Sequence, residues 1–263
     1  MIHDATNPLM SRIREHSQEL AVAGNGRLSA ALRTILIWLS LFSWPAWLPG
    51  AMAQEAAFKP APDSGTFDII SAKNKVGTET FQIKANETGW EATGELQLSG
   101  AGGAKTSETG TLRLDGKLRP SYYERLQKSP ISGKLVAQIG ATETLLEISD
   151  EDEPFQQVFY LSSNDLVVLD TNFFHHYALL LRLYDRAKGM AQAFNVFIPQ
   201  EALPGTINLQ YLAKETVPVG QSSKELDHFQ ATTDELQIEI WATPEGAIQR
   251  ISIPQANLEV VRQ

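Results

Sequence analysis

Cysteine is absent from all 263 residues of the chain. Its absence excludes disulfide bonds, thiolate metal sites, cysteine nucleophiles and a lipid-modified N-terminal cysteine. The sequence also lacks the glycine loops that bind phosphates or dinucleotides, and the Gly-x-Ser-x-Gly frame of a serine nucleophile elbow. Histidine is scarce, with five in the chain. No familiar catalytic motif is therefore present, and we expect a protein that is not an enzyme and holds no metal or cofactor.

A long apolar run does occur, but only near the N-terminus. Residues 34–50 are apolar, four arginines precede them, and Ala51-Met52-Ala53 follows with the small-x-small form that a signal peptidase accepts. This order predicts a secretory signal peptide over residues 1–53. Met10 is an alternative start, because the stretch before the apolar run is long. An uncleaved membrane anchor is the alternative, although two prolines would break its helix near the end.

The chain that would remain after cleavage, residues 54–263, is acidic. Residues 1–53 hold four of the 22 basic and three of the 31 acidic residues, so 18 basic and 28 acidic residues remain. A negative surface disfavours nucleic acid and anionic lipid headgroups as partners. We expect a periplasmic or secreted protein with no membrane span after cleavage.

Alternation of apolar and polar residues dominates the rest of the sequence. After a leader of residues 54–65, Phe81 and Ile83 alternate with Gln82 and Lys84, and similar segments recur at short intervals up to the end. A period of two is typical of antiparallel strands with one dry and one wet face. Residues 66–263 therefore predict a single, mainly β domain of about a dozen strands.

One segment departs from this pattern, and it predicts an amphipathic helix over residues 171–188. Asp170 suits the N-cap and Gly189 the C-cap. At 100° per residue, the broad apolar side carries Phe173, Phe174, Tyr177, Leu180, Leu181, Leu183, Tyr184 and Ala187. The polar side carries His175, Arg182, Asp185 and Arg186, with Leu179 as its apolar exception. Such a helix should cover the dry face of the sheet.

Two adjacent histidines lie in this helix. The side chains of His175 and His176 diverge by about 100°, so a regular helix cannot direct both at one metal ion. His175 is expected on the wet side and His176 at the edge of the dry side. There His176 is either a boundary residue or a polar group at the mouth of a cavity. Elsewhere, His228 is expected in solvent and Trp241 as an exposed contact residue.

Several features together resemble the half-barrel superfamily of bacterial lipoprotein-localisation carriers and similar secreted envelope families. These are the signal peptide, the meandering strands, the single helix, and the hairpins in "GTFDIISAKNKVGTETFQI" (65–83) and "IWATPEGAIQRISI" (240–253). The resemblance covers most of residues 65–262. It implies a strongly curved antiparallel sheet, a half-barrel or open barrel, with the helix on a concave face that receives acyl chains in the carriers. No ligand-contact residue of the family is matched.

Three functions remain open at this point. The first is carriage of a lipid or other apolar ligand between sheet and helix. The second is a ligand-free structural or protein-interaction module of the cell envelope, which would use an exposed strand edge or Trp241. The third is a hydrolase with an unrecognised site. For the first hypothesis, the expected ligand-binding residues are Phe173, Phe174, His176, Tyr177, Leu180, Leu181 and Tyr184.

Overall fold

The computed structural model describes residues 61–99, 105–129, 131–149, 154–219 and 222–263, which form fifteen strands and one α-helix. The first eight strands are β1 (Asp63–Ser71), β2 (Asn74–Asn86), β3 (Gly89–Ser99), β4 (Lys105–Asp115), β5 (Pro120–Ser129), β6 (Gly133–Ile139), β7 (Thr144–Ser149) and β8 (Phe155–Phe159). The others are β9 (Leu166–Val168), β10 (Gln192–Ile198), β11 (Leu203–Val219), β12 (Ser222–Thr232), β13 (Gln237–Ala242), β14 (Ile248–Ile253) and β15 (Leu258–Arg262). The helical elements are α2 (His176–Leu183), η2 (Arg186–Lys188), η3 (Pro199–Glu201) and η4 (Pro254–Ala256).

All fifteen strands belong to one sheet. Their order is β8-β7-β6-β5-β4-β3-β2-β1-β15-β14-β13-β12-β11-β10-β9. Every neighbouring pair is antiparallel except β9 and β10, which are parallel. Two meanders therefore meet where β1 pairs with β15, with Phe67 opposite Arg262. The expected mainly β fold is confirmed, and β1 begins at Asp63 rather than at residue 66.

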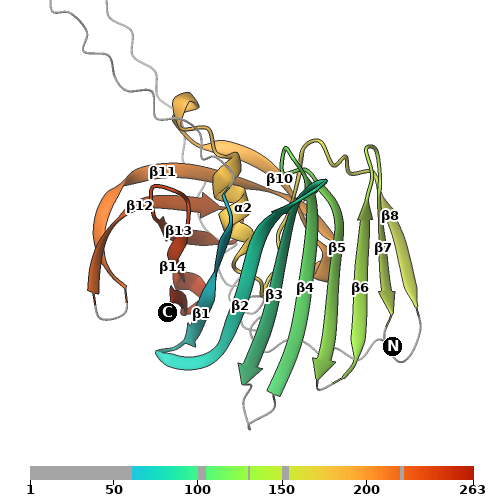
Figure 1. The fold of residues 1–263 in the computed structure, drawn as a ribbon, viewed down its shortest axis with the longest axis horizontal. Helices are drawn as coiled ribbons and strands as arrows, with labels where there is room; N and C mark the ends of the chain where they lie inside the picture. Colours follow the sequence, from blue (N-terminus) through green and yellow to red (C-terminus); the bar gives the residue numbers. More distant parts are fainter. Residues whose placement is uncertain (1–60, 100–104, 130, 150–153, 220–221) are drawn as a thin grey trace, which may run out of the picture. The chain divides into compact units, whose positions relative to one another are not determined.

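The sheet must be rolled, because β8 and β9 lie at its opposite edges but follow one another in the chain. Fifteen flat strands would be roughly 65 Å wide, whereas the connecting residues 160–165 span at most about 25 Å. Contacts close this distance: the rings of Phe159 on β8 and Phe197 on β10 lie 5.0 Å apart, and β9 contacts β5. Figure 1 shows the curved sheet with α2 inside its curve.

The period-two pattern decides which side chains enter the interior. On β3, Ala92 and Leu96 are fully buried while Glu95 and Gln97 are exposed. The largest buried side chains of the sheet include Phe67, Phe81, Leu112, Tyr123 and Phe229. Burial of this apolar face is the main source of stability for the fold.

The helix is shorter than the predicted 171–188. The α-helix covers only His176–Leu183, and Tyr184 ends it with an extended backbone. Asp170 is not the N-cap: its carboxylate accepts the N–H of Asn172 at 2.7 Å, which forms a local turn before the helix. Gly189 ends η2 instead of α2. The helix prediction was therefore right in place and wrong at both ends.

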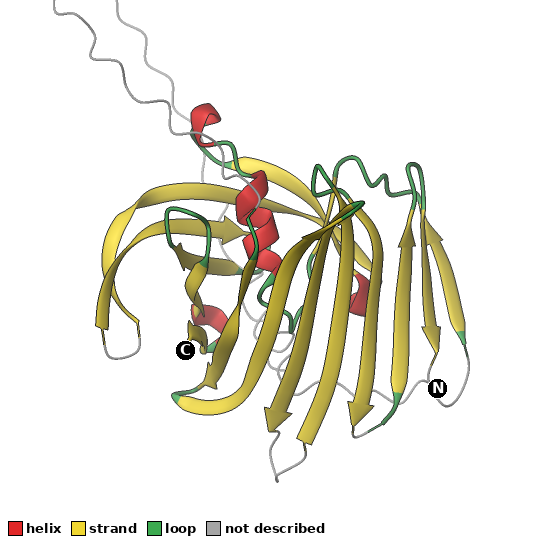
Figure 2. Cartoon of the chain, viewed as in Figure 1, coloured by secondary structure: helices red, strands yellow, loops and turns green. Residues whose placement is uncertain are grey.

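The solvent-facing side assigned to the helix was also wrong at His175 and Arg182. Figure 2 shows α2, in red, inside the curve of the sheet with strands on either side of it. His175 and His176 are fully buried, and Leu179 and Arg182 are buried as well. A rolled sheet surrounds a helix where a flat sheet covers one side, so His175 and Arg182 are buried, whereas Asp185 and Arg186 beyond the end of α2 stay partly exposed. Among the described residues, no helix is long and apolar enough to cross a membrane.

Candidate functional site

The segment leading into α2 is held in a cradle of two glycines. Gly94 of β3 and Gly110 of β4 are register partners on the inner face. A Cβ atom at Gly94 would lie 2.6 Å from Cδ1 of Phe173, and one at Gly110 would lie 2.8 Å from its Cε2. Only residues without a side chain let the Phe173 ring lie this close to the sheet. This contact fixes the segment against the centre of the first meander.

A buried carboxyl group binds the backbone of the two residues that precede the helix. Glu79 of β2 is fully buried, and its Oε2 accepts the N–H of Phe174 at 2.9 Å. Its Oε1 accepts the N–H of His175 at 3.4 Å and is also bonded to Nδ1 of that ring. Glu79 therefore binds the start of the helix to the sheet from a position 95 residues earlier in the chain.

Burial makes this pair electrically neutral. Desolvation raises the pKa of Glu79 to about 8 and lowers the pKa of His175 to about 3. Near pH 7 the Glu79 carboxyl group is therefore protonated and donates to Nδ1, which leaves the imidazole proton on Nε2. That Nε2 is buried and has no hydrogen-bond partner among the described residues.

His176 is similarly isolated. Its ring lies edge-on to Tyr123 at 5.7 Å and to His175 at 4.6 Å between centroids. Neither ring nitrogen has a partner among the described residues. Desolvation, followed by the neighbouring His175, lowers the pKa of His176 to about 3, so the ring is neutral.

Two further pairs complete the buried polar cluster. The Tyr123 hydroxyl donates to Asp170, and Arg125 donates to both oxygens of Glu108 at 2.9 and 2.7 Å. Desolvation raises the pKa of Glu108, with Arg125 opposing that rise. Among the described residues, no group of three or more histidine, aspartate or glutamate side chains is arranged to hold a metal ion.

These buried acids of the inner face were not predicted, although their positions in the sequence mark them. Glu79 stands two residues before Phe81, and Glu108 stands four before Leu112, so both fall on the apolar register of their strands. A charged residue in an apolar register is expected to be buried and partnered.

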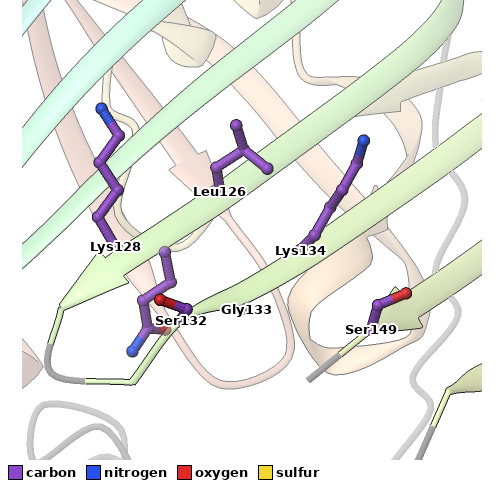
Figure 3. Close-up of a pocket in the computed structure, with 7 residues that line it drawn as sticks. Leu126, Lys128, Ser132, Gly133, Lys134 and Ser149 are labelled. Carbon is purple, nitrogen blue, oxygen red and sulfur yellow. The ribbon is translucent and has the colours of Figure 1, made fainter. Parts of the chain in front are cut away.

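The seven expected ligand-binding residues are brought together by the fold. They lie in the interior around α2, and each is at most 9% exposed: Phe173, Phe174, His176, Tyr177, Leu180, Leu181 and Tyr184. They do not line the surface hollow in Figure 3, which has a volume of 460 Å³ and lies at the ends of β5, β6 and β7. That hollow is open and carries two lysines, Lys128 and Lys134.

The expected exposure of His228 and Trp241 was wrong. Trp241 is 9% exposed, and its ring stacks on that of His228 at 4.5 Å. Both nitrogens of His228 are bonded, to Glu215 at 2.9 Å and to Glu239 at 2.7 Å. The pair sits on the face opposite to Phe229, where a second apolar cluster forms with Val217, Val219 and Leu226. His228 and Trp241 therefore have a structural role, and Trp241 is not an exposed contact residue.

An exposed apolar surface occurs instead on strand β8. Phe155 is 46%, Val158 49% and Tyr160, just after the strand, 89% exposed. On one side β8 pairs with β7, with Phe155 opposite Ile148. No described strand pairs with its other side. The result is an open, uncharged strand edge.

Comparison with solved structures finds a β-barrel-like protein of the domain of unknown function DUF1849 from Brucella abortus. The TM-score is 0.54 at 10% identity, over 79% of this chain and 97% of that chain. A DUF1089 family protein from Pseudomonas aeruginosa has a TM-score of 0.41 at 11% identity, over 65% of this chain and 86% of that chain. No protein-family model and no curated protein matches the chain. The first similarity supports a barrel-like fold and nothing about function.

Proposed function

We propose that this domain is an interaction module of the cell envelope that binds an extended segment of a partner protein along β8. The observation that carries the proposal is the open edge of that strand. Its backbone N–H and C=O groups on one side have no strand to pair with among the described residues. Addition of a strand would satisfy these groups and cover apolar side chains at the same time.

Natural sheets usually protect such edges with lysine, proline or a bulge. The sequence of β8, FQQVF, has none of these residues, and its pairing with β7 shows no register shift. Gln156 and Val158 project to one side of the strand, and Phe155 and Gln157 to the other. An unprotected apolar edge of this kind favours pairing with another chain.

A photo-reactive amino acid tests the proposal. It replaces Val158 in one variant and Leu203 in a matched control, because both side chains are 49% exposed. Leu203 lies on β11, where it pairs with Ile198 of β10, and not on the β8 edge. In the envelope of the native host, the variant at 158 should give a defined covalent adduct that Phe155→Lys reduces. Equal yields at 158 and 203, or no adduct at either, would contradict the proposal.

The mass of the adduct identifies the occupant. An adduct of twice the chain mass would mean that two copies pair edge to edge. A different mass, with one extended peptide of another protein attached, is the result we expect.

Carriage of a lipid or apolar ligand is the second candidate, as the resemblance to lipoprotein-localisation carriers implies. Unpartnered polar atoms on His175, His176 and Arg182 favour it, because they make the closed position of α2 costly. Entry would require α2 to separate from the sheet. Organic extraction of protein purified from the envelope should then recover a lipid. An empty extract, together with no uptake of an apolar fluorescent dye, would reject this candidate.

Export and binding without catalysis are parts of the same proposal. The support for export is the apolar run and cleavage motif within residues 1–53, which lie outside the described residues. The support for binding rather than catalysis is burial: Glu79, His175 and His176 are fully buried and do not line the open surface hollow.

A further inference from the structure

Arg182 is a buried arginine without a carboxylate partner. The residue is 5% exposed and belongs to α2, whose other residues are largely apolar. Its Nε and Nη1 atoms are buried and have no hydrogen-bond partner within the described part of the chain. An unpaired buried cation is among the costliest arrangements in a folded protein, so a missing counter-charge is implied.

An acid whose charge acts on Arg182 is already paired with another arginine. Asp63 of β1 is the carboxylate whose charge acts on Arg182, opposing the larger effect of burial, which lowers the arginine pKa. However, Arg262 donates to both Asp63 oxygens, at 2.7 and 3.3 Å. Asp63 is therefore paired with Arg262, and no carboxylate among the described residues forms an ion pair with Arg182.

A second unpartnered donor lies on the same side of the helix. His175 has helical backbone angles and precedes Arg182 by seven residues, about two turns. Long side chains on a helix lean toward its N-terminus, which directs the guanidinium of Arg182 toward His175. Because Glu79 donates to Nδ1, the free Nε2 of His175 is also a donor. The unsatisfied groups on this side are thus all donors.

We propose that Arg182 and the Nε2–H of His175 form a binding site for one oxyanion, a carboxylate or a phosphate group, on the β1 side of α2. A single negative charge would balance the surplus charge of Arg182 and Arg262 against Asp63. The oxygens of a planar carboxylate or a tetrahedral phosphate group accept several N–H hydrogen bonds at once. This matches the several N–H donors of an arginine guanidinium group. The surrounding rings of Phe67 and Phe81 are apolar, which strengthens such bonds.

The proposal does not depend on the β8 edge and fails or stands by itself. Calorimetric titration of the full chain, in a buffer free of oxyanions, would use acetate, inorganic phosphate and dodecanoate as probes. Wild-type protein should bind at least one of them. Arg182→Met should weaken that binding roughly tenfold or more. The matched control Arg113→Met removes an arginine with a 57% exposed side chain and should bind within about twofold of wild type.

The probes distinguish two sources of the anion. Dodecanoate binding much more tightly than acetate would identify an amphiphile with an acidic head. Comparable binding of phosphate and dodecanoate would identify a free inorganic or small organic anion. Absence of binding for all three probes, or equal binding by Arg182→Met and Arg113→Met, would overturn the proposal.

Two measurements keep the test valid if Arg182→Met folds poorly. In wild-type protein, the ¹⁵Nε–H resonance of Arg182 should shift on addition of the bound probe, and a resonance that stays in place would overturn the proposal. Arg182→Lys, which keeps the charge and loses the fork, should bind with intermediate affinity. In anion-free buffer, Arg182→Met should melt no lower than wild type, since it removes an unpaired buried charge.

Discussion

Histidine has different surroundings on the two faces of the sheet. On the inner face, His176 has no hydrogen-bond partner among the described residues, and burial lowers its pKa to about 3. On the outer face, His228 is nearly as buried, but both its nitrogens bond to glutamates and its ring stacks on Trp241. The inner ring fills space, whereas the outer ring links strands β11, β12 and β13. The surroundings of each ring decide its role, and amino-acid type alone does not.

Among the substitutions on the inner face, Leu180→Asp should cause the largest loss of stability. Leu180 is fully buried, so the substitution removes apolar contacts and places a carboxylate among them. We expect a loss of about 4 kcal/mol or more in the free energy of unfolding. The matched change Leu212→Asp, at a side chain 41% exposed, should cost less than about 1 kcal/mol. Urea denaturation measures both. Equal losses would mean that α2 is a detachable cover and not part of the core.

The glycine cradle gives the next largest expected effect. Gly94→Ala would place a methyl group 2.6 Å from the Phe173 ring and 2.8 Å from the His175 ring. Overpacking of this kind costs about 1 to 3 kcal/mol. Gly116→Ala is the control, since a Cβ there meets nothing within 4 Å, and its effect should stay within about 0.5 kcal/mol. Thermal unfolding of both variants would reveal whether the cradle holds the helix; a silent Gly94→Ala would show that it does not.

Ionisation of three buried side chains on the inner face should make the free energy of unfolding depend on pH. Because the folded pKa of Glu79 is raised to about 8 from an ordinary 4.5, its contribution is lost as pH rises toward 8. The lowered values for His175 and His176 act oppositely, and their contribution is lost as pH falls below 6.5 toward 3. The summed contribution of these three groups to stability should therefore be greatest near pH 6.5.

Glu79→Gln isolates the alkaline side of this profile. Glutamine keeps a donor to Nδ1 of His175 and an acceptor for the N–H of Phe174, but it cannot ionise. Between pH 6.5 and 8, wild-type stability should fall by about 1 to 2 kcal/mol more than that of the variant. Denaturation curves at several pH values provide the measurement. Parallel profiles for both proteins would show that Glu79 ionises normally.

Direct replacement of the two contrasted histidines should give the smallest effects, with opposite signs. His176→Phe removes two unsatisfied nitrogens and keeps an aromatic ring, so it should stabilise the fold by about 1 kcal/mol. His228→Phe breaks two hydrogen bonds to Glu215 and Glu239 and should destabilise the fold by about 1 kcal/mol. Melting temperatures would decide the signs. If both variants are destabilised equally, the contrast between the faces is wrong.

The period-two alternation of residue types predicted the sheet, and the segment that departs from it predicted the position of the helix. Leu96 and Phe81 lie inside because each strand exposes successive side chains on opposite faces. The start of the helix was not predictable from local residues, because Glu79 of a distant strand binds the backbone of Phe174 and His175 just before it. Local capping rules favoured Asp170, which bonds to Tyr123 instead.

The candidate sites were harder to predict, for a geometric reason. His175 and Arg182 were assigned to a wet side because both are polar and lie opposite the broad apolar arc of the helix. Rolling of the sheet removes that side, and rolling depends on how strands of distant sequence pair. The open edge at β8 was likewise hidden, since "FQQVF" reads as an ordinary strand until its missing neighbour is known.

The order of the strands has a consequence for engineering the chain. The backbone N–H of Gln263 bonds to Thr66 at 3.0 Å, so a short linker would join residue 263 to residue 63. If new termini were opened within residues 160–165, each strand from β9 round to β8 would follow its spatial neighbour in sequence. Such a circular permutant makes the pairing of β1 with β15 local in sequence, although α2 still packs against the distant strands β2–β4. With all strand pairs then local, it should fold faster than the natural arrangement while keeping the same architecture.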